Sequence, residues 1–150
     1  MTILNEYETT YVARPDLTDE QMTRITSKIE GVVANQGGTL LVAEDWGKRK
    51  LAYLIKKHAR GHYIYLNYCG PSPLVLEVER NLRLEDDLLR FLTVKIEADV
   101  VPDERRPLAE ERKRLRIERM AALKAEEEAE ARYRAEAEEE EGELDAVLED

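Results

Sequence analysis

The sequence predicts an α+β fold: a four-stranded antiparallel sheet with two helices on one face, followed by a charged C-terminal extension. Three observations lead to this prediction. Segments with the apolar spacing of strands and helices follow one another as strand, helix, strand, strand, helix, strand. This order is a split β-α-β repeat, which closes most simply as such a sheet. Beyond it, Ala, Glu, Arg, Lys and Leu make up most of the chain, which marks a separate charged segment.

The first strand and the first helix are expected at residues 6–13 and 18–36. Along residues 6–13 the tyrosines share one side, which predicts a strand with one drier face. Thr18 offers an N-cap oxygen, and Gln21, three positions later, completes a capping box. Apolar residues then recur at helical spacing until two glycines, beginning at Gly37, supply a left-handed stop.

Two further strands joined by a turn are expected between residues 39 and 68. Gly47 indicates a bend or bulge within the first of these strands. Residues 57–61 are expected to turn the chain back, and residues 62–68 form the returning strand. Ser72 is then expected to be the N-cap of the second helix, and the proline that follows it favours the first helical turn.

The last strand is expected at residues 89–97, where apolar and polar residues alternate again. Two helices on one side of the sheet would leave its second face uncovered. Apolar side chains predicted on that face are Val12, Tyr63, Tyr65, Leu92 and Val94. Exposed apolar patches of this kind usually mark a partner site. The alternative is that scattered aromatic residues are merely tolerated there.

Charge divides the chain into a domain, residues 1–103, and a tail, residues 104–150. Residues 1–104 carry 13 Lys and Arg against 17 Asp and Glu, residues 105–124 carry 8 against 3, and residues 125–150 carry 2 against 13. Glu–Arg pairs at i,i+4 spacing favour a solvated helix that continues into a largely disordered acidic end. The basic part could contact RNA, or the tail could be a solvated extension without a dedicated role.

A single cysteine and the lack of long apolar runs exclude several protein classes. Cys69 has no partner for an internal disulfide or a cysteine-based zinc site, which fits a reducing compartment. No stretch approaches the roughly 20 apolar residues that span a bilayer, and no apolar run follows a basic start. The sequence therefore predicts a soluble, cytoplasmic protein.

Motifs typical of catalysis are missing from the sequence, which has no Gly-rich phosphate loop, GxSxG elbow or HExxH helix. His58 and His62 make a poor metal site because neither cysteine nor a nearby carboxylate accompanies them. A small phosphatase of the same architecture would need a phosphate-binding loop, whereas Arg14 stands in a turn without a Gly-rich cradle. We therefore expect no enzyme, no cofactor and no metal. A ligand-sensing dimer is a further alternative.

The strongest functional signal is the stretch from Trp46 to Tyr68, WGKRKLAYLIKKHARGHYIYLNY. It combines six Lys or Arg and five aromatic residues with no carboxylate. Cations interleaved with flat rings suit RNA, because cations contact phosphates and rings stack on bases. A solvated basic face is the alternative. The candidate RNA-binding residues are the cations of this stretch and three that could extend the patch: Lys48, Arg49, Lys50, Lys56, Lys57, Arg60, Arg83, Arg90 and Lys95.

A different mode of RNA binding would place residues 60–65, RGHYIY, where RNA-recognition motifs carry their aromatic consensus. The Arg-Gly start fits this consensus. His62, however, stands where Phe or Tyr is expected, and bulky Tyr63 stands where Gly or Ala is expected. A stand-alone module of the RNA-recognition-motif type is therefore the weaker alternative.

Three segments resemble the bacterial small-subunit ribosomal protein six family: EYETTYVARPDLTDEQ, WGKRKLAYLIKKHARGHYIYLNY and ERNLRLEDDLLRFLTVKI. The likeness runs from about Glu6 to Glu97 with the same spacing of elements. It implies a ferredoxin-like fold, no enzymatic activity and a place in the small ribosomal subunit. It further implies binding to small-subunit (16S-type) ribosomal RNA as a heterodimer with small-subunit ribosomal protein eighteen.

On the family's pattern, Arg49, Lys50 and Lys95 are the strongest candidates for RNA or interface cations, and Tyr65 and Val94 for partner contacts. The remaining partner-binding candidates are Tyr53, Tyr63 and Leu92. Two features depart from the pattern. The residues before the first strand are uncharged, where some family members carry basic ones, and the resemblance implies no role for the long acidic tail.

Overall fold

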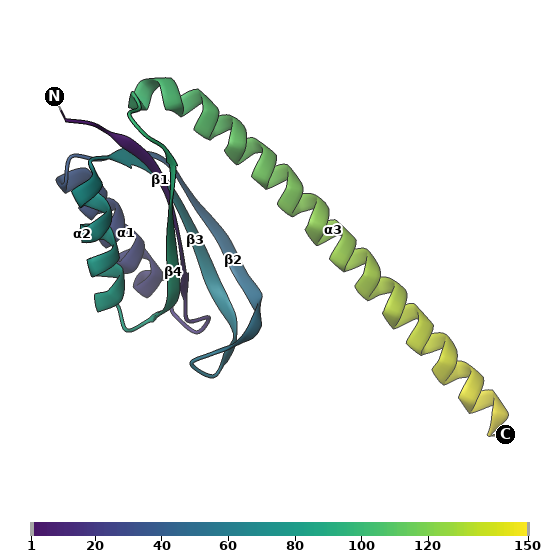
Figure 1. Ribbon diagram of the computed structural model, residues 1–150. Helices are drawn as coiled ribbons and strands as arrows, with labels where there is room; N and C mark the ends of the chain where they lie inside the picture. Colours follow the sequence, from purple (N-terminus) through teal and green to yellow (C-terminus); the bar gives the residue numbers. More distant parts are fainter. Residues whose placement is uncertain (1, 150) are drawn as a thin grey trace. The chain divides into compact units, whose positions relative to one another are not determined.

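The computed structural model describes residues 2–149 and has the predicted architecture (Figure 1). Its four strands form an antiparallel sheet in the order β2-β3-β1-β4, and the helices α1 and α2 cover one face of it. The ferredoxin-like α+β fold is therefore confirmed. The elements are β1 (Asn5–Ala13), α1 (Asp19–Asn35), β2 (Thr39–Ile55), β3 (His58–Gly70), α2 (Ser72–Leu84), β4 (Leu88–Glu97) and α3 (Pro102–Leu148).

The two ends of α1 follow from local sequence. Thr18 is the N-cap: its Oγ1 accepts a hydrogen bond from Gln21 N at 3.2 Å, and Thr18 N donates to Gln21 Oε1 at 2.9 Å. The predicted capping box is thus confirmed. Gly37, with φ of +78°, ends the helix in the left-handed region, and the next residue donates its N–H to Val33 O.

The N-terminus of α2 differs from the prediction. Pro71 is the N-cap, no side chain caps the helix, and Ser72 is its first residue. The Ser72 hydroxyl is used elsewhere, since its Oγ accepts a hydrogen bond from Asn5 Nδ2 at 3.3 Å. A proline at the cap keeps the extended backbone that precedes a helix (φ −70°, ψ 155°) without a capping side chain.

Side chains of α1, α2 and the central strands form the main core, whose largest fully buried members include Tyr11, Ile25, Leu66 and Tyr68. Hydroxyl groups inside this core are hydrogen-bonded to one another. Thr9 Oγ1 lies 2.7 Å from the Tyr68 hydroxyl and 2.9 Å from the hydroxyl of Thr93 on β4. Burial raises the pKa of Tyr68 to about 12, so its hydroxyl stays neutral and can donate.

Two smaller apolar clusters lie on the sheet face opposite α1 and α2, called the open face below. Val12, Leu51 and Leu89 form one of them, and Cys69 and Ala109 belong to the other. Val12 and Cys69 alternate along their strands with residues of the main core, which places them on this second face. Val12 was expected to be exposed there, but the clustered side chains bury it.

The chain divides into two compact units, Met1–Glu110 and Glu111–Asp150, so the first turns of α3 belong to the sheet domain. Arg105 Nε donates to Glu6 Oε1 at 2.5 Å, and Ala109 is buried. Before the helix, Val100 N donates to the carbonyl of Leu4 at 2.8 Å. The first unit therefore extends past residue 103, the end expected from charge alone.

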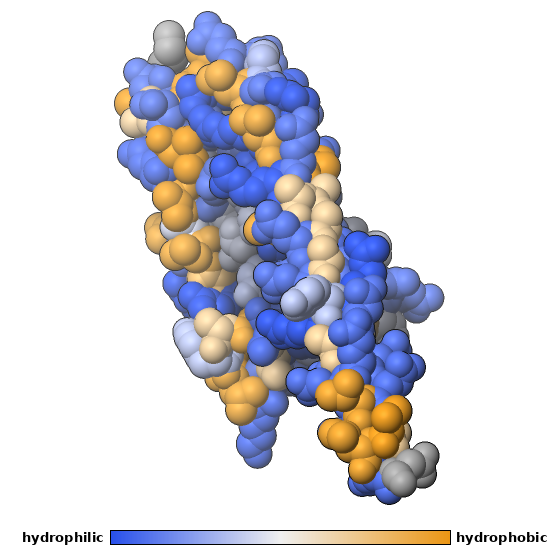
Figure 2. All heavy atoms as spheres, turned by 90° about the vertical axis from the view of Figure 1, so that its right-hand side faces the viewer, coloured by the Kyte–Doolittle hydropathy of each residue, from blue (hydrophilic) through white to orange (hydrophobic). Residues whose placement is uncertain are grey.

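The sequence predicts a largely disordered acidic end, whereas in the structure α3 continues as a helix to Leu148. Abundant Ala, Glu and Arg have high helix propensity, and Arg114 bridges two acids of its own helix, Glu111 at 2.6 Å and Glu118 at 3.0 Å. Hydrophilic side chains cover most of this helix (Figure 2). Apolar side chains gather at its C-terminal end, which carries the exposed residues Leu144, Val147 and Leu148.

Candidate RNA and protein interface

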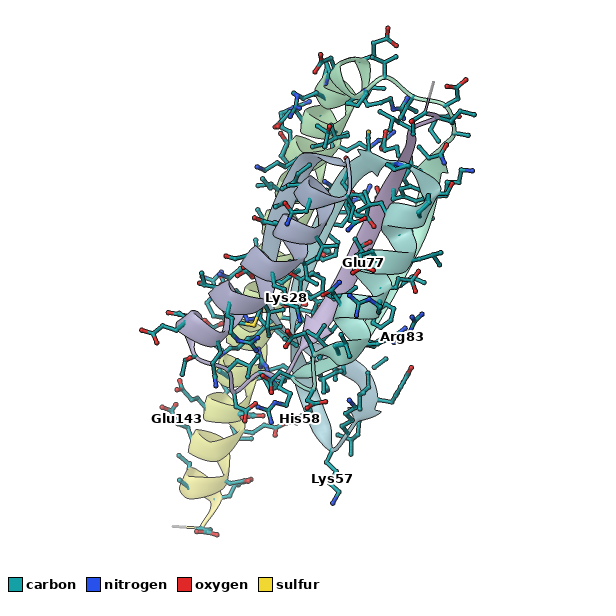
Figure 3. The ribbon with its side chains drawn as sticks, turned by 90° about the vertical axis from the view of Figure 1, so that its left-hand side faces the viewer. Lys28, Lys57, His58, Glu77, Arg83 and Glu143 are labelled. Carbon is teal, nitrogen blue, oxygen red and sulfur yellow. The ribbon has the colours of Figure 1, made fainter. Side chains whose placement is uncertain are left out.

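The β2–β3 hairpin turns at Lys56 and Lys57, which both have positive φ, 47° and 68°. This is the two-residue turn whose twist matches that of antiparallel strands. The predicted turn over residues 57–61 is therefore wrong: His58 already pairs with Ile55, and residues 58–61 belong to β3. Figure 3 shows Lys57 at the tip of the hairpin, with its side chain pointing away from the domain.

Replacing Lys57 by glycine is expected to raise the free energy of unfolding by about 0.5–1 kcal/mol, because glycine adopts a positive φ without a Cβ penalty. Urea denaturation of the two proteins would measure this difference. Lys57→Ala is the matched control, since it removes the same charge and keeps the strain. Equal stability of the two variants would contradict a role for the backbone conformation.

Like charges face each other across the hairpin. Lys50 pairs directly with Arg60, both side chains are exposed, and Lys48 lies two residues away on the same strand. Arg60 also donates through Nη2 to the carbonyl oxygen of Lys48 at 3.3 Å. Like charges opposite each other in an antiparallel pair destabilise the sheet. The arrangement is therefore better suited to holding an anion than to holding the hairpin together.

Arg49 lies over an aromatic stack on the open face. Its guanidinium carbon is 5.8 Å from the centre of the Trp46 ring, and that ring stacks on Tyr65 at 5.1 Å with an interplanar angle of 12°. Tyr65 is anchored in turn, because its hydroxyl donates to Glu8 Oε1 at 2.7 Å. The predicted irregularity at Gly47 is confirmed, with φ of +76° and a register shift that follows Asp45. A cation–π contact of this kind restricts the guanidinium and leaves its N–H groups able to donate.

The turn end of the hairpin contacts the first residues of β4. Lys56 Nζ donates to the carbonyl of Leu88 at 3.2 Å, and Arg90 Nη1 donates to the hydroxyl of Tyr53 at 3.3 Å. The structure therefore brings Arg90 to the hairpin. Six of the nine candidate RNA-binding residues therefore lie on the hairpin, and Arg90 contacts it from β4: Lys48, Arg49, Lys50, Lys56, Lys57, Arg60 and Arg90.

The other two candidate cations lie apart from the hairpin. Arg83 is on α2 (Figure 3), where it donates to Glu79 at 3.2 Å and lies 5.6 Å from the centre of the Phe91 ring. Lys95 pairs with Tyr7, near the end of β4 that is remote from the turn of the hairpin. The nine candidates consequently do not form one continuous patch.

A further group of charges, at the opposite end of α2 from its N-cap, is internally neutralised. Glu85 is buried and accepts hydrogen bonds from Arg24 at 3.2 and 3.3 Å and from Lys28 at 3.0 Å, while Arg14 pairs with Asp87 at 2.8 Å. Burial opposes ionisation of Glu85, but the hydrogen bonds from the two cations outweigh it and hold its pKa below the usual range. These cations stabilise the domain and are not an anion site.

Comparison with known proteins assigns the family. The model of the family described as Ribosomal protein S6 matches residues 6–95. The chain belongs to the ribosomal protein S6 family. A small ribosomal subunit protein bS6 from Citrifermentans bemidjiense is 47% identical over 95 residues, which cover 63% of this chain and 71% of the relative. Another, from Geobacter metallireducens, is 43% identical over 115 residues, covering 72% and 98%.

The fold agrees with this assignment. The crystal structure of 30S ribosomal protein S6 from Thermotoga maritima superposes with a TM-score of 0.60 at 22% identity, covering 62% of this chain and 88% of that one. S6 proteins are structural, non-enzymatic components of the small ribosomal subunit, and membership places the chain in that subunit in the bacterial cytoplasm. The expectations of the family and of a non-enzyme are thereby confirmed.

The candidate partner-binding residues of this S6 protein differ in exposure. Leu92 and Val94 on β4 are 59% and 45% exposed, and Tyr53 on the hairpin is exposed as well. Tyr63 is half-buried against the small cluster on the open face. Tyr65, expected to be exposed, is only 3% exposed because Trp46 stacks on it. Tyr65 therefore packs beneath Trp46 and contributes almost nothing to the exposed surface.

Two functional positions were missed by the sequence reasoning. Trp46 is the ring that the stack presents toward Arg49, and its place in the basic stretch was the available signal. Arg105 fixes the start of α3 on the domain, and no local pattern indicates its partner. Among residues 2–149, no group of His, Cys, Asp and Glu side chains could hold a metal, and no helix is long and apolar enough to cross a membrane.

Proposed function

We propose that this S6 protein binds small-subunit (16S-type) ribosomal RNA through the basic hairpin, together with small-subunit ribosomal protein eighteen at the apolar part of the open face. The observation that carries the RNA part is the direct pairing of Lys50 with Arg60, both exposed. Such a pair is unfavourable until an anion lies between or beside the two charges. The phosphate backbone of RNA supplies that anion.

The protein partner is supported by the apolar side chains on β4. Leu92 and Val94 lie on the open face of an edge strand, and no helix of the sheet domain covers them. Tyr53 adds an exposed ring close to Arg90. An apolar patch with a cation at its margin resembles a protein interface, in which an apolar centre is surrounded by a polar rim.

The stand-alone RNA-recognition-motif mode is less well supported. It requires exposed rings on the central strands, on which bases stack. The face of Tyr65 on β3 is occupied by Trp46, and Tyr63 is half-buried. The hairpin therefore favours phosphate contacts that fix position over base stacking that reads sequence.

The double variant Lys50→Ala, Arg60→Ala is expected to weaken binding to small-subunit ribosomal RNA about 10- to 30-fold at physiological salt. Loss of two phosphate contacts should also reduce the slope of log affinity against log salt by about 1.5. Titration of labelled RNA at several salt concentrations, with and without protein eighteen, would measure both. The control is Arg80→Ala, Arg132→Ala, which removes two exposed cations that are not part of the hairpin. Equal binding by the two variants would refute the assignment of RNA binding to the hairpin.

Replacing Leu92 and Val94 by aspartate tests the partner separately. Two carboxylates in the apolar patch should abolish complex formation with protein eighteen, because charged groups would be buried without partners. Both side chains are exposed in the isolated chain, so its own stability should change little. Size-exclusion chromatography of the mixed proteins would reveal the complex, and its persistence would show that the partner binds elsewhere.

A further inference from the structure

A column of side chains crosses three adjacent strands on the open face and ends at Arg49. It begins at Glu8 on β1, whose Oε1 accepts the 2.7 Å hydrogen bond from the Tyr65 hydroxyl on β3. Tyr65 stacks on Trp46 of β2 with ring centres 5.1 Å apart, and the guanidinium carbon of Arg49 lies 5.8 Å from the centre of the Trp46 ring. The position of this guanidinium is therefore tied to the central strands, and not only to its own backbone.

The bulge in β2 explains why Trp46 and Arg49 can meet. Residues three apart on a regular strand point to opposite faces of the sheet, because side chains alternate. The register shift between Asp45 and Gly47 inserts one extra residue, so that Trp46 and Arg49 share the open face. Gly47 N closes the bulge by donating to Asp45 Oδ1 at 2.8 Å. Opposite Arg49 on β3 lies Gly61, which has no side chain to compete for the ring.

The choice of tryptophan indicates that the ring serves the cation. Within residues 2–149 the buried Nε1 of Trp46 has no hydrogen-bond partner, and burying an unpaired N–H costs free energy. Phenylalanine would stack on Tyr65 without that cost. Tryptophan is, however, the side chain that attracts a cation most strongly, which is an advantage only for the contact with Arg49.

We propose that Trp46 is a positioning residue, which holds the guanidinium of Arg49 ready to bind a phosphate of small-subunit ribosomal RNA. This inference rests on the proposal that the hairpin binds that RNA. The planar guanidinium can donate two N–H groups to two oxygens of one phosphate. Because the ring already restrains Arg49, less side-chain freedom is lost when the phosphate binds.

The variants Trp46→Leu and Arg49→Ala and their combination, all in the full-length chain, test this inference. In titrations of labelled RNA at physiological salt, Arg49→Ala is expected to weaken binding about fivefold and Trp46→Leu about threefold. In the Arg49→Ala background the change at Trp46 should have no further effect, because the ring then has no guanidinium to hold. In the Lys50→Ala background it should keep its effect, since Lys50 lies on the other face of β2. Losses that multiply in the Arg49→Ala background would overturn the proposal.

The salt dependence separates positioning from charge. Arg49→Ala removes one phosphate contact and should reduce the slope of log affinity against log salt by about 0.7–0.9. Trp46→Leu keeps every cation and should leave the slope unchanged. Trp46→Phe keeps a ring and should recover most of the affinity. Arg49→Lys keeps the charge and the slope but should weaken binding about threefold, because an ammonium lacks the planar fork. Urea denaturation would verify that each variant is folded.

The hairpin variant Lys50→Ala, Arg60→Ala, measured alongside, separates this inference from the proposed function. If it weakens binding while the Trp46 and Arg49 variants bind as the original protein does, the positioning role is rejected and RNA binding by the hairpin stands. If none of these variants weakens binding, both assignments are rejected.

Discussion

Replacing Arg105 by alanine is expected to lower the free energy of unfolding by about 2–4 kcal/mol. Glu6 is 1% exposed, and its Oε1 accepts the hydrogen bond from Arg105 at 2.5 Å, while its Oε2 accepts one from Asn67 at 3.1 Å. Removing one member of a buried ion pair costs roughly 3–5 kcal/mol, because the remaining charge loses an interaction that offsets the cost of its burial. The partial exposure of Arg105 places the expected loss toward the lower end of that range.

Urea denaturation would measure the effect of Arg105→Ala, with Arg106→Ala as its control. Arg106 is the exposed neighbour on the same turn, so its removal should change stability by less than about 0.5 kcal/mol. Adding Glu6→Gln to Arg105→Ala should recover part of the loss, because no buried charge is then left. Equal stability of the two arginine variants would mean that the pair contributes nothing measurable.

The same reasoning applies to truncation. A chain that ends after Asp103 lacks Arg105 and the buried Ala109, so it should lose at least as much stability as Arg105→Ala. A chain that ends after Glu110, the last residue of the first compact unit, should keep the full stability of the domain. The charge pattern alone places the end of the domain at residue 103. It cannot reveal the segment beyond, because the pairing of Glu6 with Arg105 joins positions far apart in sequence.

Local signals predicted the parts of the fold that depend on local interactions. The capping box of Thr18 and Gln21 and the left-handed Gly37 fixed both ends of α1. The hairpin turn was misplaced because Lys56 and Lys57 lack the composition typical of left-handed turns, for which Asn and Gly are preferred. Glycine is typical of turns, but Gly61 lies within β3.

The candidate site was predicted in its composition but not in its packing. Alternation along the strands correctly assigned Tyr65 and Val12 to the open face, yet both are buried there by contacts that no pattern encodes. Trp46 covers Tyr65, and Leu51 packs against Val12. Leu92, which has no such neighbour in the sheet domain, remained exposed as expected.

Replacing Gly61 by alanine is expected to lower the free energy of unfolding by about 2–3 kcal/mol. A Cβ built on Gly61 would lie 2.3 Å from Val12 Cγ1, 3.4 Å from a Leu51 methyl group and 3.5 Å from the carbonyl oxygen of Ala13. Valine cannot move its methyl group away at low cost, since only its stiff χ1 is available, and overpacking of this kind typically costs 1–3 kcal/mol. The absence of a side chain at Gly61 is thus what lets the hairpin lie against β1.

Val12→Ala provides the decisive comparison. Alone it should destabilise by about 1–2 kcal/mol, because it removes two buried methyl groups. Combined with Gly61→Ala it removes the clash, so the double variant should be at least as stable as Gly61→Ala alone, a non-additivity expected of residues in direct contact. Simple addition of the two losses in urea denaturation would contradict the close approach. Because the same approach positions the cations of the hairpin, Gly61→Ala should also weaken RNA binding while the protein is still folded, and Val12→Ala should restore that binding in the double variant.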